Sequence, residues 1–163
     1  MNISKKIQEV MNKQINHEFY SAYLYLGMAA YFENQNLKGF ANWMKKQAQE
    51  EMTHGMKFFN FINERNGEVS LEMVAKPAGK WKSPLQVFEE AYAHELKVTE
   101  LIYNIVALAT AEKDYASKSF LKWFVDEQVE EEANASEIVH KLKLAGDSKG
   151  ALIMLDRELG ARQ

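Results

Sequence analysis

Residues that break helices are scarce in this chain, and its two prolines lie close together. The 163 residues include eight glycines and two prolines, and both prolines, Pro77 and Pro84, fall in one short stretch. An all-β sandwich needs turn residues about every 8–12 positions, so this distribution argues against that class. The sequence instead predicts long helices with one major interruption. With 47% hydrophobic residues, we expect one core and a single domain over residues 1–163.

Charge and composition exclude several functions. Twenty basic and 23 acidic side chains give a net charge of −3, which offers no electrostatic footprint for nucleic acid or an anionic membrane. The chain has no cysteine, so thiolate metal sites and cysteine nucleophiles are excluded. Its longest uncharged stretch, residues 19–32, is shorter than the roughly 18–20 residues that span a bilayer. The N-terminus also lacks the apolar region of a signal peptide. We therefore expect a cytoplasmic protein that binds neither nucleic acid nor membrane.

Four long segments carry helical periodicity. The apolar residues recur at three- and four-residue steps over residues 4–33, 38–66, 84–112 and 115–145. Residues 149–159 are expected to form a short fifth helix. Ser83 and Pro84 are typical of a helix start, Asp114 is a plausible cap for the fourth helix, and Gly146 ends it. The sequence shows no internal repeats and no low-complexity tracts.

The connections between these segments predict the topology. The joints after the first and third helices are a few residues long, so each pair of helices is expected to form an antiparallel hairpin. Residues 67–83 form a much longer joint that can run the length of a bundle and leave the second and third helices parallel. Polar and apolar residues alternate over 68–73, which suggests a strand-like stretch. The predicted fold is all-α, a four-helix bundle with one long crossover and a short fifth C-terminal helix.

Each of the four long apolar stripes is interrupted near its middle by side chains that can bind metal. The interrupting residues are Glu18 on the first helix, Glu51 and His54 on the second, Glu95 on the third, and Gln128 and Glu131 on the fourth. Residues three, four and seven apart share one helix face, so these groups point toward the expected core.

Hairpin register indicates that the interruptions meet. A first turn centred at about residue 35.5 places Glu18 level with about residue 53, between Glu51 and His54. A second turn centred at about residue 113.5 places Glu95 level with about residue 132, beside Glu131. Two independent hairpins therefore bring their polar residues to matching levels.

A single buried glutamate is commonly explained by a lysine or arginine partner. Four carboxylates converging with one imidazole would repel one another and be costly to desolvate, and no lysine or arginine lies on these faces at that level. Two divalent metal ions would balance the four negative charges. The ligands are rich in oxygen, with one nitrogen and no sulfur, which favours iron or manganese, and spacing alone does not separate these two.

The chain resembles the ferritin-like di-iron carboxylate proteins, and most closely the bacterial non-haem ferritins. The resemblance rests on NHEFY at 16–20, QEEMTH at 49–54 and FLKWFVDEQVEEE at 120–132, and it covers essentially the whole chain. It implies an iron-storage protein that oxidises Fe(II) with dioxygen at a dinuclear ferroxidase centre and keeps the ferric product as mineral in a cage.

The resemblance also implies roles for individual residues. One iron would be bound by Glu18, Glu51 and His54, with Glu51 bridging to a second iron held by Glu95 and Glu131. Members of the family often have a third iron position, and the residues that match its ligands are Glu50, Glu127, Glu130 and Glu131. Further matching positions are Gln128, as a group beside dioxygen or a hydrogen-bonding group, and Tyr25, as an electron donor. Trp123 is expected to be a packing aromatic, the alternative being that it assists Tyr25. For Glu127 and Glu130, the alternative is a solvated acidic face.

The sequence departs from bacterioferritin, the haem-bearing relative. Gln128 and Glu131 stand where bacterioferritin carries Glu-x-x-His, and Met52 occupies its haem-ligating position. Non-haem relatives also carry methionine there, so Met52 is weak evidence and we do not expect haem. The other histidines, His17, His94 and His140, are expected to be structural or exposed.

The first helix predicts self-association. Residues 19–32 are apolar almost all round, more than one inward face requires, so a second burial surface is expected. The resemblance specifies a hollow cage of 24 subunits, with the crossover and first helix at two-fold contacts and the fifth helix around the four-fold axis.

Two other functions stay open. One is a small di-iron oxidase or peroxidase without storage, although the chain carries no cysteine-rich electron-transfer module. The other is a non-catalytic bundle whose polar layer only specifies register. The sequence also leaves open whether dioxygen or hydrogen peroxide is the oxidant.

Overall fold

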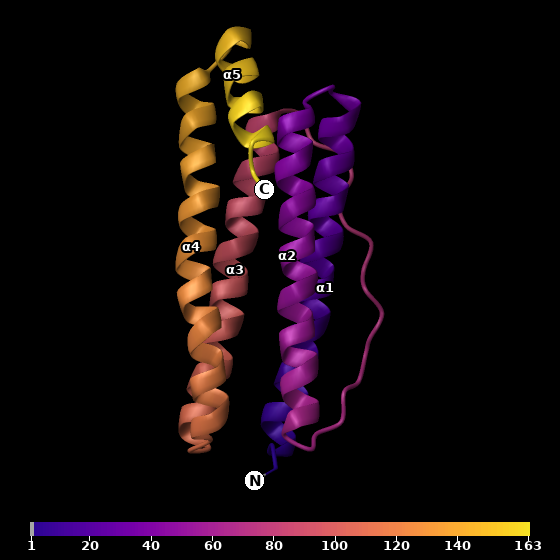
Figure 1. Ribbon diagram of the computed structural model, residues 1–163, viewed down its shortest axis with the longest axis vertical. Helices are drawn as coiled ribbons and strands as arrows, with labels where there is room; N and C mark the ends of the chain where they lie inside the picture. Colours follow the sequence, from indigo (N-terminus) through magenta and orange to yellow (C-terminus); the bar gives the residue numbers. More distant parts are fainter. Residues whose placement is uncertain (1) are drawn as a thin grey trace.

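The computed structural model describes residues 2–163, which form five helices (Figure 1). These are α1 (Lys5–Asn34), α2 (Lys38–Glu64), α3 (Pro84–Ala111), α4 (Tyr115–Ala145) and α5 (Lys149–Gly160). Every boundary lies within two residues of its predicted position. The all-α prediction is confirmed, because the structure assigns no strand within 2–163.

Local capping explains where the helices begin and end. The Ser83 side chain accepts a hydrogen bond from the Gln86 amide at 3.2 Å, and Asp114 accepts one from the Ser117 amide at 3.1 Å. These bonds satisfy amides that have no partner within the first helical turn. Just after the end of α2, Asn66 adopts the left-handed backbone conformation, with φ of 55°. Asparagine tolerates this conformation better than most residues do.

The helices pair as two hairpins (Figure 1). Helix α1 runs antiparallel to α2, and α3 runs antiparallel to α4. The crossover between α2 and α3 runs the length of the bundle, so that α2 and α3 run parallel. This arrangement brings the middle of all four helices to the same height.

The strand-like stretch predicted for residues 68–73 is wrong. The segment is a coil along α1, and asparagine side chains bind its backbone where a partner strand would. Asn12 Nδ2 donates to the Glu68 carbonyl at 3.0 Å, and Asn12 Oδ1 accepts from the Ser70 amide at 3.0 Å. Asn16 donates to the Met73 carbonyl at 3.2 Å. Alternation alone did not reveal that the segment has no neighbouring strand with which to form a ladder.

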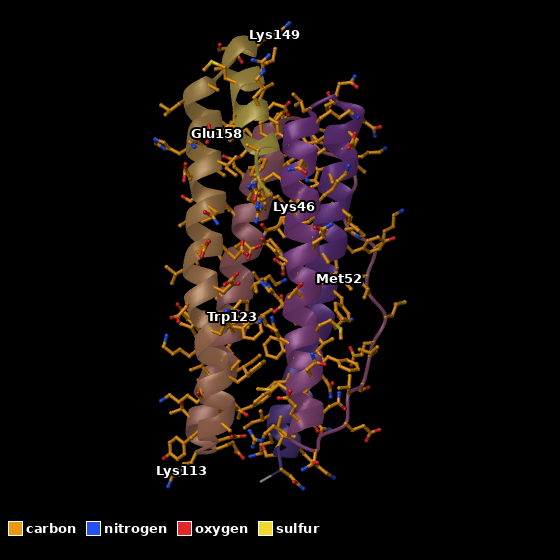
Figure 2. All side chains as sticks on the ribbon, in the orientation of Figure 1. Lys46, Met52, Lys113, Trp123, Lys149 and Glu158 are labelled. Atoms are coloured by element: carbon orange, nitrogen blue, oxygen red, sulfur yellow. The ribbon has the colours of Figure 1, made fainter. Side chains whose placement is uncertain are left out.

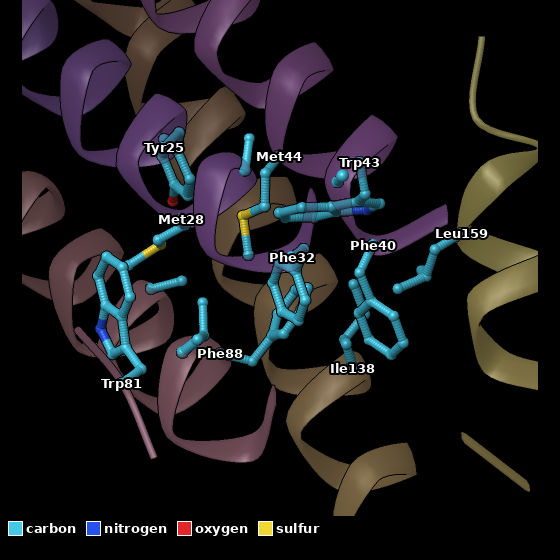
Figure 3. Packing of buried hydrophobic residues seen from close by; sticks show 14 of the residues in the cluster. Tyr25, Met28, Phe32, Phe40, Trp43, Met44, Trp81, Phe88, Ile138 and Leu159 are labelled. Atoms are coloured by element: carbon cyan, nitrogen blue, oxygen red, sulfur yellow. The ribbon is translucent and has the colours of Figure 1, made fainter. Parts of the chain in front are cut away.

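Two apolar clusters fill the bundle, one on each side of its middle. The first includes Phe32, Phe40 and Phe88, and Figure 3 shows these rings packed together with Trp43. The second contains Phe58 and Phe124, whose ring centroids lie 4.2 Å apart. Buried carboxylates and amides lie between the clusters.

Helix α5 folds back against α2 and α4. Asp156 on α5 accepts hydrogen bonds from the Gly39 and Phe40 amides at 2.8 and 3.0 Å, so it caps α2, which lacks a side-chain cap of its own. A Cβ on Gly39 would stand 1.6 Å from the Asp156 carbonyl oxygen, so only glycine permits this close crossing. The C-terminal tail then lies beside α2 (Figure 1).

Within residues 2–163, no helix combines the length and apolar character needed to cross a membrane.

Candidate metal centre

The structure brings the six predicted ligand residues into one buried layer. Their side chains come from all four long helices, and each is between 1% and 4% exposed. They are Glu18 on α1, Glu51 and His54 on α2, Glu95 on α3, and Gln128 and Glu131 on α4. In Figure 2 oxygen-bearing side chains lie between the two hairpins near the middle of the bundle. The hairpin register therefore predicted the placement correctly.

Two overlapping groups of side chains have spacing suited to a metal ion. Glu18, Glu51 and His54 each offer a ligand atom within 4.8 Å of the others, and so do His54, Glu127 and Glu131. His54 belongs to both groups, because its Nδ1 lies 3.5 Å from Glu51 Oε2 and its Nε2 lies 3.7 Å from Glu127 Oε1. Atoms that share one ion at about 2.1 Å lie up to about 4.2 Å apart, so small rotamer changes close either group around a metal.

Burial and mutual repulsion perturb the carboxylates. Desolvation raises the pKa of Glu51 well above its ordinary value, and the charges of Glu95 and Glu131 raise it further. Desolvation and the Glu51 charge likewise raise the pKa of Glu18. The pKa of Glu131 rises to about 8, first through burial and then through Glu95. The pKa of Glu95 is also raised by burial. Burial in the metal-free layer therefore favours the protonated forms of these groups, whereas a bound cation would favour their charged forms.

An unsatisfied oxygen indicates where a cation fits. Glu18 Oε2 is buried and has no hydrogen-bond partner within the described chain, whereas Glu18 Oε1 accepts from Gln14 Nε2 at 2.8 Å. Buried polar atoms of this kind are rare unless a ligand or water satisfies them. Glu18 is a member of the metal-compatible group that also contains Glu51 and His54. The donor set thus fits a metal that prefers oxygen with one imidazole nitrogen.

Amides and hydroxyls orient these carboxylates. Gln47 Nε2 donates to Glu131 Oε2 at 2.6 Å, and Gln128 Nε2 donates to Glu95 Oε2 and Thr99 Oγ1, both at 3.2 Å. Tyr25 is fully buried, and its hydroxyl donates to Glu95 Oε1. Burial, followed by the charge of Glu95, raises the pKa of Tyr25 well above its ordinary value, so the hydroxyl keeps its proton at the edge of the layer.

The residues predicted for a third metal position are less closely gathered. Glu127 is half-buried and faces His54, while Glu130 is exposed on α4. Glu50 accepts a hydrogen bond from Arg162 Nη2 at 2.5 Å. Of this set only Glu127 and Glu131 belong to a metal-compatible group in the described residues. Trp123 is 38% exposed and packs its ring 5.3 Å from that of His54.

The remaining histidines lie outside both metal-compatible groups. His94 Nε2 lies 2.7 Å from Ser21 Oγ, and burial lowers the pKa of His94 to about 4. His17 is half-buried and His140 is exposed. Met52 lies on α2 (Figure 2) and is 47% exposed, beside an apolar groove that Phe19 and Val74 also line.

Thr99 and Arg162, which contact side chains of the layer, were not predicted from the sequence. Thr99 lies one helical turn after Glu95, a spacing that could have identified it. Arg162 lies beyond the last helix, and its Nη1 donates to Gln47 Oε1 at 3.0 Å. No periodic pattern reaches the C-terminal tail, so helix spacing gave no indication of this contact.

Comparison with known proteins agrees with the geometry. Residues 8–145 match the model of the ferritin-like domain family. The chain belongs to the ferritin family. The bacterial non-heme ferritin of Bacteroides fragilis (strain 638R) is 45% identical over 160 residues, which cover 98% of this chain and 99% of the relative. The one from Staphylococcus aureus (strain USA300) is 41% identical over 160 residues, covering 98% and 96%.

Solved ferritin structures give the same result. A crystal structure described as a novel open pore ferritin from the hyperthermophilic archaeon Archaeoglobus fulgidus matches with a TM-score of 0.99 and 54% identity, covering 99% of this chain and all of that one. An engineered closed form of the Archaeoglobus ferritin matches with a TM-score of 0.98, at the same identity and 99% coverage of both chains. The predicted fold and family are therefore both confirmed.

Proposed function

We propose that this ferritin stores iron and oxidises Fe(II) at a dinuclear centre in the middle of the bundle. The observation that carries the proposal is the convergence of four buried carboxylates and His54, where one oxygen of Glu18 has no hydrogen-bond partner among residues 2–163. Iron is the substrate of this reaction. Ferritin relatives at 41–45% identity over nearly the whole chain support the assignment.

Each carboxylate has a role in this proposal. Glu18, Glu51 and His54 bind the first iron, while Glu51, Glu95 and Glu131 bind the second, so that Glu51 bridges the two. The two ions give one electron each to dioxygen, the oxidant we propose, which takes up two electrons and two protons. The buried carboxylates release their protons as the metals bind, because a cation favours the charged form.

Neighbouring residues complete the centre. Gln128 borders the second iron, where it donates a hydrogen bond toward Glu95. We propose Tyr25 as a further donor, which would give one electron and its hydroxyl proton to the oxidant after the two irons have reduced it by two electrons. The contact of its hydroxyl with the same carboxylate supports this role. We also propose that Glu50, Glu127, Glu130 and Glu131 form a third iron position that passes iron to or from the centre. Glu127 supports this position best, because it shares His54 with the inner group.

Storage requires an enclosed space, which one helical bundle does not provide. We propose that the whole chain, residues 1–163, is one ferritin-like domain and that 24 copies form a hollow cage in the cytoplasm. Tyr23 and Leu26 on α1 are each about half exposed and line the same apolar groove as Met52. An exposed apolar surface of this kind supports burial against a second copy.

A ferric oxidation assay tests this function. Fe(II) added in air should give the ultraviolet absorbance of ferric oxo species, and Glu51→Ala should slow its appearance by about 100-fold or more, because the substitution removes the bridging ligand. Arg157→Met, an exposed change on α5, is the control and should oxidise iron at the wild-type rate.

The outcomes separate the alternatives. Absence of the ferric signal, or its persistence in Glu51→Ala, would contradict the catalytic proposal and favour a polar layer that only sets register. Oxidation by a small oligomer that retains no mineral would indicate a di-iron oxidase without storage. Mass measurement and iron content after loading distinguish that enzyme from a cage.

A further inference from the structure

The C-terminal tail is bound to α2 beside the metal centre. The guanidinium of Arg162 lies 4.6 Å from the centroid of the Trp43 ring and donates to the Trp43 carbonyl at 3.4 Å. Asn42 Nδ2 donates to the Arg162 carbonyl at 3.0 Å. Both the backbone and the side chain of this penultimate residue are therefore held, which restricts where its donors point.

The same guanidinium spans two further groups on α2. Nη1 donates to Gln47 Oε1 at 3.0 Å, and Nη2 donates to Glu50 Oε2 at 2.5 Å. Guanidinium has a rigid fork of donors and no acceptor, so it can approach only the oxygen of the Gln47 amide. Glu50 pairs with the other arm of the fork and fixes its angle.

Gln47 links the Arg162 guanidinium to the carboxylates of the metal layer. Its side chain is fully buried, and its Nε2 donates to Glu131 Oε2 at 2.6 Å and to Glu51 Oε1 at 3.4 Å. With Oε1 turned toward Arg162, the amide must present its NH2 group to these two carboxylates. Hydrogen bonds of this kind select which carboxylate oxygens remain available to a metal.

We propose that Arg162 is a positioning residue of the metal centre, which acts through Gln47 to orient Glu131 and Glu51 for the second metal. This inference rests on the proposed dinuclear site and adds to it a dependence on the C-terminal tail. Docking of the tail and metal affinity are then coupled, because loss of the tail contact frees the Gln47 amide to rotate.

The test uses Co²⁺ as a redox-inert probe of the assembled protein. Its visible absorption reports coordination geometry, and titration gives stepwise affinities without any turnover. Arg162→Met removes the fork, Arg162→Lys keeps the charge without the fork, and Gln47→Leu removes the amide. We expect each to weaken the second Co²⁺ step by about three- to tenfold and to change the absorption band. Arg157→Met, which removes a charge from the exposed face of α5, should leave both steps unchanged.

The sign of the change separates positioning from charge. Removing a positive charge near the layer would by itself strengthen cation binding. Tighter binding by Arg162→Met, or wild-type affinity in Arg162→Lys, would overturn the inference. Arg162→Met combined with Gln47→Leu should match Gln47→Leu alone, and an additive loss would also overturn it.

Two further measurements keep the inference testable. If Arg162→Met does not assemble, Asn42→Ala loosens the tail without touching the amide, and it should weaken the same step to a smaller extent. Unchanged Co²⁺ binding in Asn42→Ala would then overturn the inference. If the wild type binds no Co²⁺ in this layer, or Glu51→Ala leaves its titration unchanged, the proposed function itself fails. If those controls behave as expected and Arg162→Met matches the wild type, only the role of Arg162 fails.

Discussion

The middle layer of the bundle and the apolar clusters on either side are equally buried but have opposite chemistry. Phe58 and Phe88 in the clusters are inaccessible to solvent, and Glu18 and Glu95 between them are only 1% exposed. Removing the apolar surface of the clusters from water stabilises the folded protein. Burying the carboxylates of the layer destabilises it, and their raised pKa values reflect the cost of burying a charge. Burial therefore stabilises one region, whereas the other needs protons or metal ions.

A second contrast separates paired from unpaired carboxylates. Asp114, at the start of α4, accepts two hydrogen bonds from the Arg65 guanidinium, at 3.1 and 3.2 Å. Burial raises its pKa, but the hydrogen bonds from Arg65 and Ser117 outweigh that effect and leave the pKa below its ordinary value. Within residues 2–163 no lysine or arginine forms an ion pair with Glu51, and burial raises its pKa. The same functional group is thus a structural anchor in one place and a candidate metal ligand in the other.

The layer and the clusters should differ most in how the free energy of unfolding changes when one buried side chain of each is replaced. Phe58→Ala opens a cavity against Phe120 and Phe124 and should lower the free energy of unfolding by about 3–5 kcal/mol. Glu51→Gln should leave the metal-free protein as stable or more so, because it removes a buried group that can carry charge. Urea unfolding at fixed protein concentration measures both. An equal decrease in the free energy of unfolding in the two variants would contradict the proposed difference between the layer and the clusters.

The pH dependence of stability sharpens the same contrast. Glu131 has a folded pKa of about 8 against an ordinary 4.5, so its stabilising contribution is complete below about pH 4.5 and is lost as pH rises through 8. The metal-free protein should lose on the order of 2 kcal/mol between pH 6.5 and 8. His94, with its pKa lowered to about 4, acts in the opposite direction but only below about pH 6.5.

Bound metal should remove this dependence of stability on pH. Saturating Co²⁺ displaces the protons, so unfolding midpoints should no longer fall over this pH range. Thermal unfolding in matched buffers, with and without Co²⁺, checks the expectation. A metal-free protein that is equally stable at pH 6.5 and 8 would show that the layer carries no excess protons.

The smallest expected effect concerns the paired carboxylate. Asp114→Asn keeps one acceptor but weakens the bond to Arg65 and the cap of α4, and it should cost about 1–2 kcal/mol. Co²⁺ affinity should not change, because Asp114 lies at the end of the bundle. Urea unfolding and Co²⁺ titration of the same preparation test both parts. Weaker Co²⁺ binding would show that the end of the bundle and the metal layer are coupled.

Much of this arrangement could be predicted from the sequence, because helix geometry is regular. Once the turns were located, the 3.6-residue repeat placed Glu18 opposite Glu51 and His54, and Glu95 opposite Glu131. Caps at Ser83 and Asp114 were visible as local patterns, and both form the expected hydrogen bonds. Within the regular helices, residue spacing alone was sufficient to predict which side chains meet.

The remaining features depend on contacts that have no period. The C-terminal tail reaches Gln47 through Arg162, 115 residues away in the chain. Residues 68–73 alternate as a strand would, but side chains of α1 bind their backbone instead. The third-site prediction identified residue types but not partners, and Glu50 bonds to Arg162. Helical periodicity predicts neither the contacts of the C-terminal tail nor the partner of each ion pair.

Anomalous diffraction from crystals soaked anaerobically with Fe(II) shows whether the buried polar layer binds two metal ions. We expect two iron peaks inside the layer, one bounded by Glu18, Glu51 and His54 and the other by Glu51, Glu95 and Glu131. Iron found only on surface carboxylates, with no peak between the hairpins, would contradict it.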